Sequence, residues 1–169
     1  MNARSQDPHC TRQANIHAPV LGLAVPPRKN ATSYPNPFRE RFVGRQKRAL
    51  GDHFGLHNFG VNLTRLPPGA MSALRHAHSR QDEFVFVLQG ELMLVDESGR
   101  TILTRGMCIG FPAGAGNAHH FINESGADAI VLEIGDRSSL DEVCYPDDDL
   151  MATLIDGQWR MTRKDGTPY

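Results

Sequence analysis

The sequence is poor in the features that mark secreted, disulfide-rich and membrane proteins. Its 169 residues include three cysteines, Cys10, Cys108 and Cys144, an odd number without the spacing of a disulfide framework. We therefore expect free thiols and a reducing compartment. No apolar run approaches the roughly 20 residues that a membrane-spanning helix needs, and the first residues lack the apolar stretch of a secretory signal. These absences favour a cytoplasmic protein without a membrane partner.

An excess of charge of either sign is also missing. Lysine and arginine number 18 against 19 aspartates and glutamates, so the formal net charge is −1. Such a balance creates no global field that would attract nucleic acid. One local cationic stretch exists within Arg39–Arg48, but it has no helix-turn-helix pattern and no interleaved aromatics. We interpret it as a solvated face or as a partner for the acidic run Asp147–Asp149, and we expect no nucleic-acid partner.

Long amphipathic helices are absent too, and short β-type runs replace them. Only Ser139–Glu142 has the pattern of one helical turn. From Phe59 onward, seven runs alternate with Gly, Pro and other turn residues: FGVNLTRL, EFVFVL, ELMLV, RTILT, MCIGF, HHFIN and AIVLEI. The turn sequence Asp96–Gly99 predicts a hairpin between ELMLV and RTILT. This pattern is typical of an all-β sandwich or barrel.

The length suits a single domain preceded by an arm. Residues 1–35 are rich in Pro, Asn and Ser without periodicity, so we expect an extended N-terminal arm there. Residues 36–169 would then form one domain, with its barrel core at about 59–135.

The run EFVFVL is apolar on both faces. Alternation places Glu83 with Val85 and Val87 on one face and three large apolar residues on the other. A strand of this kind is normally covered on both sides, here by the arm, a second sheet or a partner subunit. We therefore expect a homodimer.

Cys108 lies in another apolar run, and we expect it to be a small core residue.

The pattern His76-x-His78-x4-Glu83 carries the clearest chemistry. Residues two apart on a strand point the same way with a separation of about 7 Å, so His76 and His78 can approach one ion. Four residues allow a turn that returns Glu83 to the same interior. Imidazole and carboxylate together suit a divalent transition metal and leave coordination positions open. A further imidazole must come from a distant part of the chain, where His119 and His120 are the candidates.

Two stretches resemble the paired motifs of the cupin family: His76-x-His78-x4-Glu83-x6-Gly90 and Gly106-x5-Pro112-x-Gly114-x4-His119-x3-Asn123. The resemblance implies an all-β, double-stranded β-helix (jelly-roll) cupin barrel. It also implies that one divalent transition metal (Zn, Fe, Mn or Ni) is held by four ligands: His76, His78, Glu83 and His119.

The second motif departs from the family pattern. Four residues instead of two separate Gly114 from His119, so the loop before the histidine pair is longer. This leaves the choice between His119 and His120 open. The spacing from His119 to Asn123 favours His119, and alternation along the strand would then turn His120 outward.

A looser resemblance concerns the reaction. The stretches Gly60–Leu63, Glu133–Arg137 and Tyr145–Asp149 are similar to those of small bacterial single-domain cupins, some of which carry the label sugar-phosphate isomerase. This implies an isomerase or epimerase acting on a small polar molecule, a sugar or phosphorylated sugar. The metal would polarise a carbonyl or hydroxyl group while Glu83, the candidate catalytic residue, moves a proton.

Two other functions fit the same ligand set. One is an iron-dependent dioxygenase, and the other is a non-catalytic cupin in which the metal shapes a pocket for a small ligand. A phosphorylated substrate would need Arg or Lys at the barrel mouth. Arg65, Arg75 and Arg80 lie close enough to the motifs in the sequence to be candidates.

Overall fold

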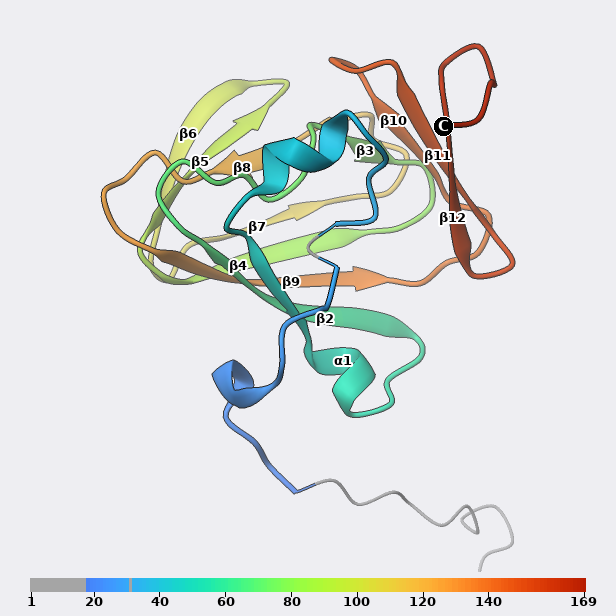
Figure 1. Ribbon diagram of the computed structural model, residues 1–169. Helices are drawn as coiled ribbons and strands as arrows, with labels where there is room; N and C mark the ends of the chain where they lie inside the picture. Colours follow the sequence, from blue (N-terminus) through green and yellow to red (C-terminus); the bar gives the residue numbers. More distant parts are fainter. Residues whose placement is uncertain (1–17, 31) are drawn as a thin grey trace, which may run out of the picture.

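The protein is an antiparallel β-barrel with one single-turn helix (Figure 1). The computed structural model describes residues 18–30 and 32–169; the first part of the predicted arm, with Cys10, lies outside the described residues. The predicted all-β jelly-roll class is confirmed. Within the described ranges, no helix is long and apolar enough to cross a membrane.

The described residues form twelve strands: β1 (Gln46–Ala49), β2 (Phe59–Leu66), β3 (Ala77–His78), β4 (Glu83–Gln89), β5 (Glu91–Asp96), β6 (Gly99–Thr104), β7 (Cys108–Phe111), β8 (His120–Ile122), β9 (Ala129–Asp136), β10 (Glu142–Tyr145), β11 (Leu150–Ile155) and β12 (Gln158–Thr162). The helix α1 spans Leu50–His53, and 3₁₀ turns span Gly22–Ala24 and Phe38–Phe42.

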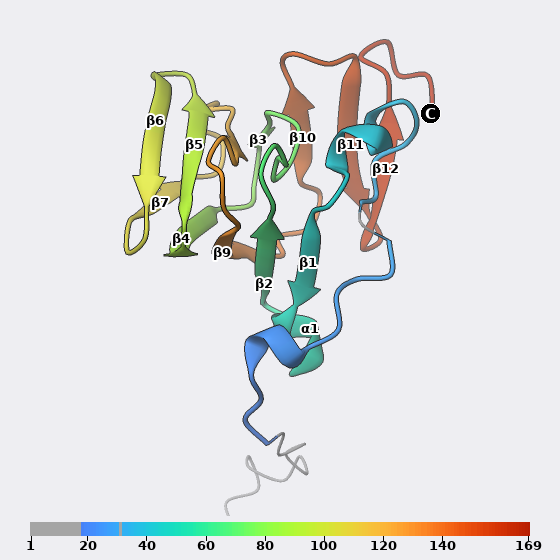
Figure 2. The same cartoon turned by 60° about the vertical axis from the view of Figure 1, so that its left-hand side comes forward.

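The strands form three sheets (Figure 2). The five-stranded sheet has the order β1-β2-β9-β4-β7, the three-stranded sheet β6-β5-β8, and the four-stranded sheet β12-β11-β10-β3. Two isolated bridges, Met71 to Ile122 and His76 to His119, join the segment before β3 to the region of β8. The two smaller sheets are thereby linked through the backbone at the point where two of the motif histidines meet.

One core cluster lies between the five-stranded and three-stranded sheets. It includes Val85 and Val87 of β4 and Leu92 and Leu94 of β5, all at most 3% exposed. Val85 and Val87 therefore face inward, as the alternation in EFVFVL predicts. Burial of each such side chain stabilises the fold by about 1.5–3 kcal/mol.

A second core cluster ties the chain before β1 to β10 and β11. Tyr34, Phe38 and Phe42 pack with Tyr145 and Leu150, and Phe42 is only 1% exposed. The ring of Tyr34 stacks on Phe42 with centroids 4.9 Å apart and meets Tyr145 edge-on at 5.7 Å. Aromatic pairs in this geometry add to the stabilisation from burial alone. The chain from Tyr34 onward is therefore part of the packed structure.

The outer face of β4 is only partly covered by the described residues. Phe84 and Leu88 are 40% and 41% exposed. Cys108 pairs with Phe86 across β7 and β4 and is exposed, so the prediction that it is a core residue is wrong. Its position in the β7 register, not its apolar surroundings in the sequence, puts it on this outer face.

Glycine is required where β4 meets β5. Gly90 has a φ of 74°, in the left-handed region that favours glycine. A Cβ at this position would lie 2.6 Å from the carbonyl oxygen of Asp128. The following hairpin has the predicted turn, because Asp96 pairs with Gly99 at the ends of β5 and β6.

The side chain of Asn123, the last residue of the second motif, ties the end of β2 to the turn after β8. Its fully buried side chain donates to the carbonyl oxygens of Leu66 and Ala127 at 2.7 Å each and accepts from Ser125.

We expect Asn123→Ala to lower the free energy of unfolding by about 3 kcal/mol, because buried polar partners lose their hydrogen bonds. Urea denaturation would measure this. The exposed Asn58→Ala is the control, and an equal effect of both substitutions would contradict the role of Asn123.

Candidate metal centre

Three histidines and a glutamate meet at one point inside the barrel. His76 and His78 lie at β3, His119 directly precedes β8, and Glu83 is the first residue of β4. His76 and His119 exchange two backbone hydrogen bonds of 3.1 and 2.8 Å. Residues paired in this way project their side chains to the same side, and the two imidazole centroids are 5.0 Å apart.

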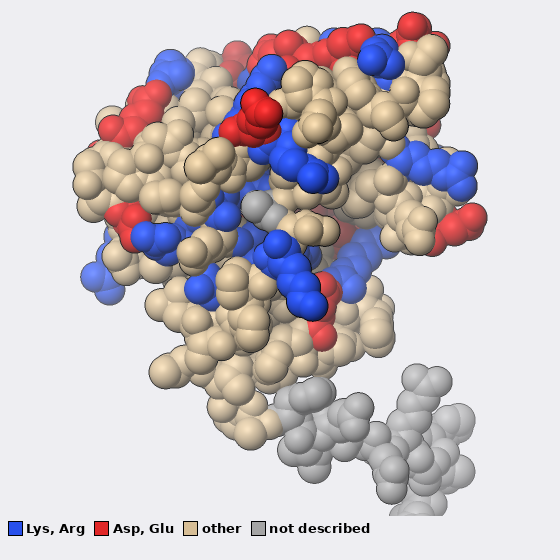
Figure 3. Space-filling view, viewed as in Figure 1, with Lys and Arg blue, Asp and Glu red and all other residues tan. Residues whose placement is uncertain are grey.

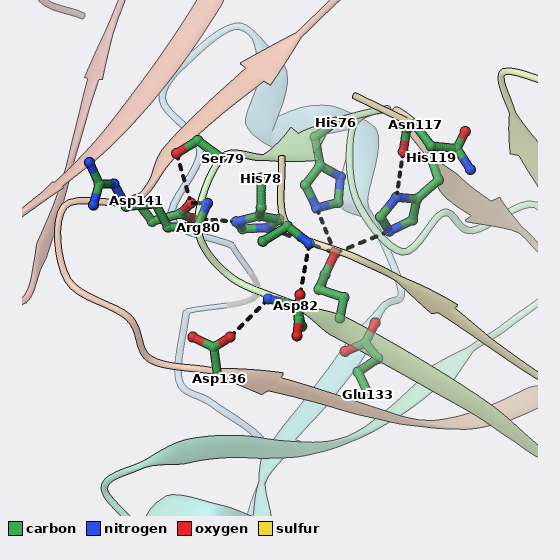
Figure 4. A network of polar contacts seen from close by, with 12 residues as sticks. His76, His78, Ser79, Arg80, Asp82, Asn117, His119, Glu133, Asp136 and Asp141 are labelled. Atoms are coloured by element: carbon green, nitrogen blue, oxygen red, sulfur yellow. Dashed lines mark hydrogen bonds and ion pairs between the residues drawn. The ribbon is translucent and has the colours of Figure 1, made fainter. Parts of the chain in front are cut away.

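The imidazoles converge on a single carboxylate oxygen (Figure 4). The Nε2 atoms of His119, His76 and His78 lie 3.0, 3.4 and 3.7 Å from Oε2 of Glu83. Despite these distances, no described residue is aligned to donate a hydrogen bond to this buried oxygen. Native proteins rarely leave a buried carboxylate oxygen in this state. A cation among these atoms would satisfy it, so the donor set fits a metal.

Three of the four predicted ligands form a compact group. Ligand atoms of His76, Glu83 and His119 all lie within 4.8 Å of one another. His78 is outside that group, although its ring faces the same oxygen. The arrangement could hold one metal ion on two imidazoles and a carboxylate, with His78 beside it.

The ionisation of the cluster also suits a cation. Burial opposes ionisation of Glu83, but the imidazoles of His119 and His76 outweigh it and hold the pKa of this carboxyl well below its usual range. Burial alone would lower the pKa of His76, but the Glu83 carboxylate raises it above its usual value. Glu83 is therefore a buried anion. A metal ion would take the place of protons on the neighbouring rings.

Each imidazole is fixed by a contact through its other nitrogen. The Nδ1 partners are the Leu74 carbonyl oxygen for His76 (2.8 Å), Asp141 Oδ2 for His78 (2.5 Å) and the Asn117 carbonyl oxygen for His119 (3.3 Å). Phe111 of β7 stacks on His119. These partners keep the Nε2 atoms directed at Glu83, an arrangement typical of metal-binding histidines.

His120 has a different environment from His119. The side chain of His119 is 4% exposed and faces Glu83, whereas Nδ1 of His120 contacts the carbonyl oxygen of Ala73 at 3.2 Å. Burial lowers the pKa of His120. The longer loop after Gly114 therefore leaves His119 as the member of the pair that lies in the cluster.

Asp141 is a site residue that the sequence did not reveal. Its fully buried carboxylate contacts His78 and accepts from the backbone N–H of Arg80 at 2.7 Å and from Ser79 Oγ at 3.2 Å.

The predicted helical turn at Ser139–Glu142 is wrong. Leu140 instead has a φ of 58°, and β10 starts directly after Asp141.

A cavity of about 610 Å³ opens beside the cluster. This volume is within the usual range for small-molecule sites. Tyr34, Tyr145 and Trp159 form an aromatic part of its wall, and Lys47 and Glu133 line it from the inner face of the five-stranded sheet. Figure 3 shows lysine and arginine side chains gathered around a hollow in this face of the molecule.

The arginines predicted for the barrel mouth are engaged elsewhere or lie outside the cavity wall. Arg65 pairs with Asp128 at 2.5 Å, and Arg75 pairs with Asp147 at 2.8 Å. None of Arg65, Arg75 and Arg80 lines the cavity.

The basic stretch Arg39–Arg48 divides between two environments. Arg41 pairs with Asp148 at 2.8 Å, which confirms the expected contact with the acidic run. The interpretation as a solvated face is wrong for Arg45 and Lys47, which line the cavity. Arg45 is buried, with its guanidinium over the Phe42 ring, and donates to the Ser72 carbonyl oxygen.

Comparison with known proteins agrees with this geometry. The family model described as Cupin domain matches residues 62–135. A solved structure of a cupin-superfamily sugar phosphate isomerase from Silicibacter pomeroyi is 43% identical, covers 89% of this chain and 96% of its own, and has a TM-score of 0.83. A structure from Acidithiobacillus ferrooxidans, provisionally named a sugar phosphate isomerase, is 30% identical. The match covers 74% of this chain and 80% of that one, with a TM-score of 0.67.

A more distant structure shows the fold alone. The polyketide cyclase RemF from Streptomyces resistomycificus is 18% identical. The match covers 72% of this chain and 80% of that one, with a TM-score of 0.59. No functionally curated protein matched the chain. The chain belongs to the cupin superfamily.

Substitution of the two adjacent histidines tests the site directly. We expect His119→Ala to lose most of the bound metal and His120→Ala to retain it, because only His119 faces Glu83. Elemental analysis of the purified variants would measure the metal content. Equal loss, or the reverse order, would contradict the arrangement.

Proposed function

We propose that this cupin is a metal-dependent isomerase or epimerase that acts on a sugar or sugar phosphate. The observation that carries the proposal is the buried Glu83 carboxylate among imidazoles at one side of a ligand-sized cavity. The relatives from Silicibacter pomeroyi and Acidithiobacillus ferrooxidans support this reaction class, because both carry the name sugar phosphate isomerase.

Four residues would hold the metal: His76, His78, Glu83 and His119. The contact between His78 and the buried Asp141 supports the fourth role, because a carboxylate behind a ligating imidazole fixes the ring and raises its basicity. When bound, a divalent metal supplies Lewis acidity that polarises a carbonyl or hydroxyl oxygen.

The chain's own groups supply proton transfer and substrate orientation. Glu83 is held as a carboxylate, the form in which this side chain can act as a base. The aromatic wall of Tyr34, Tyr145 and Trp159 limits water on one side of the cavity and packs against the carbon skeleton of a ligand. Glu83 is thus the candidate base, and the wall positions the carbon atom that exchanges the proton.

Deuterium incorporation from solvent would test the reaction. We expect the metal-loaded protein to exchange a carbon-bound proton of a sugar phosphate in D₂O, followed by NMR over a panel of pentose and hexose phosphates. Glu83→Gln, compared with the unsubstituted protein at equal metal content, should lower the rate by about 10²–10⁴-fold, the usual contribution of a general base. The exposed Glu124→Gln is the control.

Oxygen consumption separates this proposal from a dioxygenase. Brisk oxygen uptake with thiols or catechols, abolished in His76→Ala, would overturn the isomerase proposal. Absence of exchange across the panel, with metal bound, would favour a non-catalytic ligand-binding role.

We further propose a homodimer through the outer face of the five-stranded sheet. Phe84 and Leu88 are two large, partly exposed apolar side chains on the outer face of β4, and exposed apolar patches commonly mark interfaces. We expect a dimer by light scattering at micromolar concentration and a monomer for Phe84→Glu. Ile102→Glu, at a residue 53% exposed on β6, is the control. A monomeric unsubstituted protein would contradict the proposal.

A further inference from the structure

Charge is distributed unevenly between the cavity and the rest of the molecule. The chain has a net charge of −1, yet four cationic side chains line the cavity: Arg28, Lys29, Arg45 and Lys47. Two carboxylates share this wall, and one of them is Glu83 of the candidate metal centre. The remaining wall therefore carries three more positive than negative side chains, an environment that attracts an anion.

Lys47 and Glu83 of the candidate metal centre lie on the same face of the five-stranded sheet. Lys47 of β1 contacts Glu133 of β9 at 2.7 Å, and Glu133 pairs with Val85 of β4, which shares a face with Glu83. In the order β1-β2-β9-β4, Lys47 and Glu83 are three strand spacings apart, about 14 Å at the backbone. Their side chains point into the same cavity and shorten this span. One ligand with two different ends can reach both.

Two of the four cations, Arg28 and Lys29, lie more than fifteen residues before β1. The backbone N–H of Arg28 donates to the carbonyl oxygen of Lys47 at 2.8 Å, which fixes this segment against β1. The guanidinium of Arg28 donates to Asn62 at 3.1 Å, on the strand next to β1, and lies 3.8 Å from the exposed Asp52 of α1, a surface pair that leaves other donors of the guanidinium for a ligand. Arg28 and Lys29 are both exposed, so they face ligands that enter from solvent, whereas Arg45 is buried deeper in the wall.

The geometry points to a phosphate-monoester subsite formed by Arg28, Lys29, Arg45 and Lys47, which holds the phosphate of the substrate while its sugar end reaches the metal centre. This inference rests on the proposed function and narrows it from sugars in general to phosphorylated sugars. Arginine presents paired N–H donors that match phosphate oxygens, and lysine adds a point charge. Glu133 engages one of the three donors of the Lys47 ammonium and sets its position.

Phosphate binding by charge-matched double variants tests the subsite. Arg28→Gln/Lys29→Gln removes two exposed cations from the cavity, and Arg100→Gln/Arg105→Gln removes two exposed cations elsewhere. Titration calorimetry of the metal-loaded proteins would use inorganic phosphate, then glucose 6-phosphate and ribose 5-phosphate with their unphosphorylated sugars as comparisons. We expect phosphate and sugar-phosphate affinity to fall roughly ten-fold or more in the first variant only. Melting temperature and metal content should stay unchanged.

The outcomes separate this subsite from the proposed reaction. Equal phosphate affinity in both double variants, or no loss in either, would overturn the subsite, because binding would then depend on the metal or on overall charge. Proton exchange that is as fast with free sugars as with phosphorylated ones would also overturn it and leave the isomerase proposal intact. Selective loss of phosphate affinity without any exchange would support the subsite and count against the reaction.

Discussion

The structure depends on one buried anion, the Glu83 carboxylate at the start of β4. A charge removed from water costs several kcal/mol unless nearby groups compensate it. Here the compensation comes from imidazoles on two other segments, with His119 and His76 nearest. The backbone bridge between these two histidines joins the smaller sheets, so the contacts that hold the anion also close the barrel. Site and fold are therefore stabilised by the same residues.

The surroundings of this anion fall into two chemical regions. On one side, the hydrogen-bond partners of the histidine Nδ1 atoms fix the orientation of the imidazole rings, and Asp141 is the most buried of these partners. On the other side, the cavity wall combines aromatic residues, two of them on β10 and β12, with cations on β1 and in the chain before it. A ligand that fits both regions must combine oxygen-rich, apolar and anionic parts, and a phosphorylated sugar has all three.

The sequence predicted those parts of the site that depend on short-range spacing. Glu83, Val85 and Val87 alternate with outward residues, so the period of a strand is enough to assign their face. Residues brought in by long-range pairing were not predictable in this way. The burial of Asp141 depends on contacts with residues more than sixty positions away, and Lys47 points inward because of its pairing in the β1–β2 register.

The exposure of Cys108 also depends on strand pairing and could not be predicted from its neighbours in the sequence. Its apolar neighbours in the sequence favour a core position, but the β4–β7 register places it outside. An apolar run therefore shows that a segment forms a strand, whereas the pairing decides which of its residues are buried. For His119, short-range spacing narrowed the candidate ligands to two adjacent histidines, and the resemblance to the family motif was needed to choose between them.

The division of the cavity between barrel and flanking chain has an evolutionary consequence. The segment that matches the Cupin domain, residues 62–135, contains the metal cluster but none of the four cations, nor Tyr34, Tyr145 or Trp159. Arg28 and Lys29 are exposed, so substitutions there would change the charge of the cavity wall without disturbing either core cluster. Descendants of one barrel can thus keep a metal centre unchanged while the peripheral chain adapts to new ligands. Similarity confined to the barrel would then concern the candidate metal ligands, whereas the flanking segments carry the side chains that the proposed ligand would contact.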